Sequence, residues 1–217
     1  MRESFRGDLA RLGEQLAEMC GMAAHSMRQA SRALLTADLQ LAEQVLAADA
    51  LLDRARQSCE EHAQSLLALQ APVARDLRMI LAAVYSAEKI ERMGDLAAHI
   101  ADTARFTHPE HVVPAEFEQV FTELGEIAAA MADRVGEFTL GGAGSGFVEL
   151  NETDQAVDAL HAQVMSSITG TGWAHGVRSA TSLALIARFY ERFADQAVSV
   201  AKRLDFAETG RTPTGEV

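Results

Sequence analysis

The sequence contains few of the residues that break helices, build sheets or form disulfide frameworks. Among 217 residues it has four prolines, two cysteines (Cys20 and Cys59) and 6% aromatic residues. Two cysteines exclude a scaffold held by several disulfides and fit reduced thiols in the cytoplasm. No apolar run reaches ~18 residues and no secretory signal is recognised, so we expect neither a membrane-spanning helix nor export. The remaining composition, 48% apolar and rich in alanine and leucine, predicts an all-α globular protein.

Positive charge is also scarce. There are 19 lysines and arginines against 31 acidic residues, which gives a net charge of −12. A general nucleic-acid-binding protein needs a basic face to neutralise phosphates, so that class is disfavoured. The balance instead suits a protein that binds cations or docks on a basic partner protein.

Apolar spacing and helix breakers predict six helices, over residues 5–35, 39–69, 73–106, 115–138, 147–168 and 175–206. Pro72 marks the second turn, and glycine clusters at 141–146 and 170–172 mark the fourth and fifth. Short turns join antiparallel neighbours. We therefore predict two tandem three-helix bundles over residues 1–108 and 115–207, a linker over 109–114 and a flexible tail over 208–217.

A short acidic motif occurs twice, 100 residues apart. The first copy is Glu91-Arg92-Met93-Gly94-Asp95, and the second is Glu191-Arg192-Phe193-Ala194-Asp195. A second acidic pair, also four residues apart, precedes each copy: Asp49 and Asp53, then Asp154 and Asp158. Residues four apart share one face of a helix, so each pair points in one direction.

The four acidic residues of each half are predicted to lie level with one another. Asp49 and Asp95 are equidistant from Pro72, as are Asp53 and Glu91, and the second set is centred beside the turn at residues 170–175. Four clustered carboxylates must protonate, move apart or bind cations. Their oxygens suit Mg, Ca, Mn or Fe, so all eight are candidate metal ligands. The alternative is that they are solvated helix faces, paired with neighbouring arginines.

These residues resemble the PhoU family of phosphate-uptake regulators. The similarity lies in Pro72-Val73-Ala74-Arg75-Asp76-Leu77-Arg78, in the first acidic motif, in its second copy, and in Asp49 and Asp53. The resemblance covers residues 1–206. It implies tandem three-helix bundles and multinuclear metal clusters, often iron or zinc, on the acidic motifs.

The resemblance also implies partners. It implies a cytoplasmic adaptor between the ATPase subunit of the phosphate ABC transporter and a sensor histidine kinase. Such a protein represses phosphate-starvation genes and restrains phosphate uptake. It reaches the membrane only through its partners. Whether it forms a homodimer is left open. The second half departs from the family pattern, because it lacks the Pro-x-x-x-Asp-Leu-Arg run and keeps only Arg178. We therefore expect its site to bind metal less well or differently.

Two alternative functions are open. A carboxylate-bridged di-metal oxidase or hydrolase would use the same acidic residues, but the Glu-x-x-His pairs typical of ferritin-like centres are absent from the sequence. The third hypothesis is a helical scaffold that binds partner proteins without any metal. No nucleophile–histidine constellation and no phosphate-binding loop is recognised, so we predict a regulator that is not an enzyme.

Overall fold

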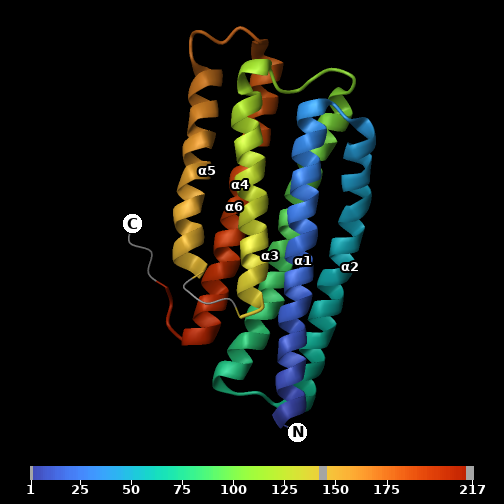
Figure 1. Cartoon of the computed structure of the whole chain (residues 1–217), viewed down its shortest axis with the longest axis vertical. Helices are drawn as coiled ribbons and strands as arrows, with labels where there is room; N and C mark the ends of the chain where they lie inside the picture. Colours follow the sequence, from blue (N-terminus) through green and yellow to red (C-terminus); the bar gives the residue numbers. More distant parts are fainter. Residues whose placement is uncertain (1, 142–145, 214–217) are drawn as a thin grey trace.

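The predicted all-α fold is confirmed. The structure is a computed structural model that describes residues 2–141 and 146–213, and within these ranges it contains helices and no strands. The six long helices are α1 (Arg2–Thr36), α2 (Leu39–Gln70), α3 (Ala74–Thr107), α4 (Glu118–Thr139), α5 (Gly146–Thr169) and α6 (Gly176–Thr209), with a 3₁₀ turn η1 (Ala115–Phe117) before α4 (Figure 1). Most of the predicted glycine-rich turn, residues 142–145, and the end of the predicted tail, residues 214–217, lie outside the described residues.

Local sequence sets where the helices begin and end. Asp38 caps α2 by accepting a hydrogen bond from the backbone N–H of Leu41 at 2.9 Å. Ala71 ends α2 in the left-handed conformation, and Pro72 follows it, so the chain reverses into α3. Gly210 ends α6 at φ 70°, which glycine adopts without strain, and its N–H bonds to Phe206 O at 2.8 Å. This helix therefore extends three residues past its predicted end at residue 206.

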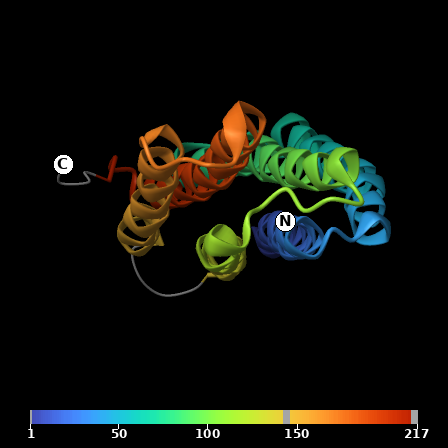
Figure 2. The ribbon, with the colours of Figure 1, turned by 90° about the horizontal axis from the view of Figure 1, so that it is seen from above.

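The helices form two layers. α2, α3, α6 and α5 lie side by side in that order, and α1 and α4 cover one side of this layer (Figure 2). α1 packs on α4 and α3 packs on α6, so the two halves of the chain meet along two seams. The buried apolar residues of both halves form one continuous core. The connection between α3 and α4 lies at the predicted linker, but the division into two domains stays a prediction because the core is shared.

Small residues let α1 and α4 approach closely. A methyl group at Gly125 would lie 2.4 Å from the Ser31 hydroxyl oxygen, which leaves no room for a side chain. That hydroxyl is buried, donates to Met27 O at 2.8 Å and accepts from Tyr190 at 2.9 Å. The network joins α1 to α6 beneath α4 and satisfies the buried polar groups involved.

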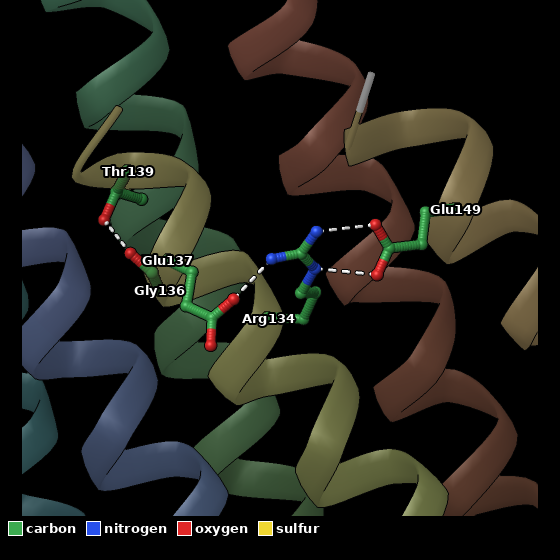
Figure 3. A network of polar contacts seen from close by, with 5 residues as sticks. All are labelled: Arg134, Gly136, Glu137, Thr139 and Glu149. Carbon is green, nitrogen blue, oxygen red and sulfur yellow. Dashed lines mark hydrogen bonds and ion pairs between the residues drawn. The ribbon is translucent and has the colours of Figure 1, made fainter. Parts of the chain in front are cut away.

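Charged pairs fix the outer helices. Arg134 of α4 donates to both carboxylate oxygens of Glu149 on α5, at 2.7 and 2.8 Å, and also contacts Glu137 (Figure 3). Bidentate pairing of this kind orients both partners.

In the described residues, no helix is both long and apolar enough to cross a membrane.

Candidate metal-binding faces

The first acidic face consists of Asp49 and Asp53 on α2 with Glu91 and Asp95 on α3. Burial, then the negative charges of Asp95 and Asp53, raise the pKa of Asp49. Burial, Asp95 and the two α2 carboxylates also raise the pKa of Glu91. The charges of Asp49, Asp53 and Asp95 all act on Glu91, so the hairpin centred on Pro72 brings the four carboxylates into one neighbourhood.

A glycine shapes this face. A methyl group at Gly94 would lie 2.4 Å from Leu52 Cδ2 and 3.7 Å from Asp49 Oδ1. Leu52 is 2% exposed, so its side chain is held in the core. The absence of a side chain at position 94 therefore lets α2 pack closely on α3 and sets Asp49 beside the acidic motif.

Arginines neutralise part of the first face. Arg56 donates to Asp53 at 2.7 Å and to Glu60 at 2.8 Å, and Arg92 donates to Asp95 at 2.8 Å. Two of the four carboxylates therefore already have a cationic partner. The His99 ring donates from Nδ1 to the backbone oxygen of Asp95 at 2.6 Å, and its charge lowers the pKa of Asp49.

The second acidic face consists of Asp154 and Asp158 on α5 with Glu191 and Asp195 on α6. Burial and the charges of Asp158, Asp195 and Glu191 raise the pKa of Asp154 to about 6. The pKa values of Glu191 and Asp195 are also raised, first by burial. Arg188 forms an ion pair with Glu191 and opposes these shifts.

Two carboxylate oxygens of the second face have no partner. Asp154 Oδ1 and Glu191 Oε2 are both buried, and neither accepts a hydrogen bond. A buried acceptor without a partner is destabilising by about 1–3 kcal/mol, more when charged, so such atoms call for a proton or a cation. In the first face, none of the four carboxylates has such an oxygen among the described atoms.

His161 belongs to the second face, although it was not predicted from the sequence. Its charge lowers the pKa of Glu191, so the ring lies near the second face. The signal was present, because Asp154, Asp158 and His161 are spaced four and three residues apart and share one side of α5. The equivalent position in the first half is Arg56, so the two faces have different basic side chains at this position.

The chemistry of the second face fits a metal. Its carboxylate oxygens, two of them buried and unpartnered, with an imidazole nearby, suit hard or borderline divalent ions. Across residues 2–141 and 146–213, however, no three acidic, histidine or cysteine side chains converge as placed on one ion. Ligation would therefore need side-chain rotation, and at the first face Arg56 and Arg92 would also have to release their carboxylates.

Both faces lie on the open side of the four-helix layer. The opposite side of this layer is covered by α1 and α4, and the residues on that side of the layer are in the core. Between the faces, the α3–α6 seam holds a polar cavity of about 370 Å³. It is lined by Glu88, Lys89, Glu91, Arg92, Asp95, Arg192 and Gln196.

Comparison with known proteins agrees with this architecture. The PhoU domain matches the chain twice, over residues 16–104 and 121–204. The chain is 44% identical to the phosphate-specific transport system accessory protein PhoU homolog 1 of Mycobacterium leprae over 213 residues, covering 98% of this chain and 96% of that protein. It is 43% identical to PhoU homolog 2 of Mycobacterium tuberculosis over 213 residues, covering 98% and 100%.

Solved structures have the same fold. The phosphate transport system regulatory protein PhoU from Streptococcus pneumoniae superposes with a TM-score of 0.85 at 25% identity, covering 97% of this chain and 99% of that one. PhoU from Pseudomonas aeruginosa superposes with a TM-score of 0.81 at 22% identity, covering 95% and 100%. The predicted family is thus confirmed, and the chain belongs to the PhoU family.

Proposed function

We propose that this chain is an accessory regulator of a phosphate transport system. The observation that carries the proposal is full-length similarity, at 39–44% identity, to mycobacterial proteins named as accessory proteins of that system. In this role it restrains phosphate uptake and represses phosphate-starvation genes when phosphate is plentiful.

The chain acts as an adaptor between the phosphate ABC transporter and a sensor histidine kinase, on the cytoplasmic side. Two acidic faces on one open side support this role. A net charge of −12 attracts basic partner surfaces over a distance, and the clustered carboxylates offer specific contacts at close range. The names of the relatives describe accessory and regulatory proteins, so catalysis is not part of the proposed function.

The faces also bind divalent cations, with Asp154 and Glu191 as the leading ligands and Asp158, Asp195 and His161 beside them. A bound cation supplies positive charge that neutralises the carboxylates and joins α5 to α6. The first face is the weaker site, because Arg56 and Arg92 compete for its carboxylates.

The test is a deletion strain that carries a phosphate-starvation reporter. Reporter activity in phosphate-rich medium should be high without the protein and low when the wild-type chain is restored. The tagged chain should also capture the transporter ATPase and the sensor kinase from detergent extracts at low salt. A reporter that stays low in the deletion strain would exclude the regulatory role.

A further inference from the structure

The C-terminal end of α6 carries positive charge that the neighbouring carboxylates do not neutralise. Lys202 and Arg203 lie on this part of α6, and both residues are exposed. Lys202 Nζ is 5.5 Å from the centre of the Phe147 ring on α5, and the Arg203 guanidinium carbon is 4.2 Å from the centre of the Tyr85 ring on α3. An aromatic ring attracts a cation but has no net charge, so both side chains keep their positive charge.

The carboxylates at this end of the molecule have other partners. Glu208 forms an ion pair with Arg75 of α3 at 2.5 Å. Asp205 Oδ2 accepts a hydrogen bond from the backbone N–H of Phe147 at 3.2 Å. Among the described residues, neither of the two cations on α6 forms an ion pair with a carboxylate. Their charge is therefore left for an anion from outside the chain.

A pocket of about 310 Å³ lies beside these two cations. Helix residues are turned by about 100° from one to the next, so Ser199 and Phe206 lie along the middle of one face of α6, with Lys202 on one side and Arg203 on the other. The lining consists of these four residues with Thr212 and Pro213. Four other cavities among the described residues each include at least one carboxylate, whereas this one includes none.

The end of α6 brings the two walls of the pocket together. Gly210 ends the helix at φ 70°, and the chain then turns back, so Thr212 and Pro213 form a wall of the pocket (Figure 1). Arg78 of α3 holds this end in place, because its Nε donates to Ala207 O at 3.3 Å. The pocket therefore depends on contacts between α3, α6 and the segment that follows α6.

We propose that this pocket binds a phosphate ester, with the phosphate group between Lys202 and Arg203 and the organic group against Phe206. The two cations and the hydroxyls of Ser199 and Thr212 offer donors from several directions, which suits the three terminal oxygens of a phosphate better than the two of a planar carboxylate. Phe206 is 38% exposed, and its ring gives the pocket an apolar surface that a free inorganic anion would leave unused. This site goes beyond the proposed adaptor function and shares no residue with either acidic face.

Binding to the purified full chain tests the proposal. Addition of phenyl phosphate to the ¹⁵N-labelled chain should shift the backbone amide NMR signals of Ser199, Arg203 and Thr212. Phenyl phosphate should bind about tenfold more tightly than inorganic phosphate, because burial of its ring adds to the charge contacts. It should also bind more tightly than benzoate, which has a ring and a carboxylate.

Each competing result has a separate meaning. Equal affinity for inorganic phosphate would overturn the ester in favour of the free anion, and equal affinity for benzoate would overturn the choice of a phosphate group. No shift at these amides with any of the three ligands would overturn the site. None of these results bears on the adaptor function, because the assay contains no partner protein.

Matched variants give an independent readout. Lys202→Gln/Arg203→Gln should weaken phenyl phosphate binding by about 10²-fold or more, because two charge-assisted contacts are lost. Arg6→Gln/Arg54→Gln removes two exposed positive charges from α1 and α2 and should leave binding unchanged. Phe206→Ala should weaken binding of phenyl phosphate but not of inorganic phosphate. Unaltered affinity in the Lys202→Gln/Arg203→Gln chain, shown to be folded by circular dichroism, would overturn the proposal.

Discussion

Asp49 and Asp154 occupy equivalent positions in the two halves, but their surroundings differ. Around Asp49, Arg56 and Arg92 hold two of the other carboxylates. Around Asp154, Arg188 holds Glu191 by one oxygen, while Asp154 Oδ1 and Glu191 Oε2 stay buried without partners. In the first face, two of the four carboxylates thus have an arginine partner, whereas in the second face two buried carboxylate oxygens have none. A repeated motif therefore does not imply two equal sites.

The expected order of metal affinity follows from this comparison. The motif departures of the second half predicted a second site that binds metal less well or differently, whereas the unpartnered oxygens favour a stronger second site. We expect the second face to fill first.

The largest expected effect is on metal binding. Asp154→Asn/Glu191→Gln should remove the tighter class of Mn²⁺ sites, with an affinity loss of about 100-fold or more, or about 2.7 kcal/mol. The physical reason is the loss of two negative charges beside the ion. Isothermal titration calorimetry measures it. The matched variant Asp49→Asn/Glu91→Gln should remove only the weaker class, and the reverse pattern would refute the proposed order.

The next effect is on packing at the motif glycine. Gly94→Ala should destabilise the protein by about 1–3 kcal/mol, because its methyl group would displace the buried Leu52 side chain. Urea denaturation measures the change. Ala194→Gly is the comparison from the second half, where loss of helix propensity costs about 1 kcal/mol and loss of the buried methyl group adds roughly 0.8 kcal/mol. A Gly94→Ala protein as stable as the wild type would show that close packing does not distinguish the faces.

A smaller effect is expected on the pH dependence of stability. The folded-state pKa of Asp154 is raised to about 6 from 3.8, so the folded chain binds the proton more readily than the unfolded chain. Without metal, this residue therefore lowers stability as pH rises from about 4 to about 6.

Asp154→Asn should remove that penalty. Above pH 6 the variant should be more stable by about 1 kcal/mol, after allowance for solvent screening, and the difference should vanish near pH 4. Thermal melts in chelator, from pH 4 to pH 8, measure it. A difference that grows as pH falls would have the wrong sign.

The smallest stability effect should come from Arg56→Gln. Its ion pairs with Asp53 and Glu60 are partly exposed, so we expect a loss of at most ~1 kcal/mol, reduced by salt. Removing this competitor should raise the metal affinity of the first face by up to about tenfold. Calorimetry with the second face disabled measures that gain. Unchanged metal affinity would mean that Arg56 does not set the difference between the faces.

The sequence predicted the helices well because their signals are local. Apolar spacing and breakers located each long helix to within a few residues, and the symmetry about Pro72 anticipated the meeting of the acidic pairs. The short 3₁₀ turn before Glu118 and the extension of α6 to Thr209 were not predicted, because end geometry depends on a few backbone hydrogen bonds.

The difference between the two faces was not predicted. It depends on which arginine rotamer reaches which carboxylate, as for Arg56 and Arg188, and on burial of single oxygens. These are tertiary properties that spacing does not encode. The shared core was missed for the same reason, since repeats suggest separate units whereas packing along two seams joins them.

The most direct measurement is anomalous X-ray diffraction from crystals of the full chain grown with Mn²⁺. We expect the strongest anomalous peak between α5 and α6, beside Asp154 and Glu191, with a weaker peak or none between α2 and α3. A peak at the α2–α3 face alone, or none at either face at saturating metal, would contradict the proposed order of the two sites.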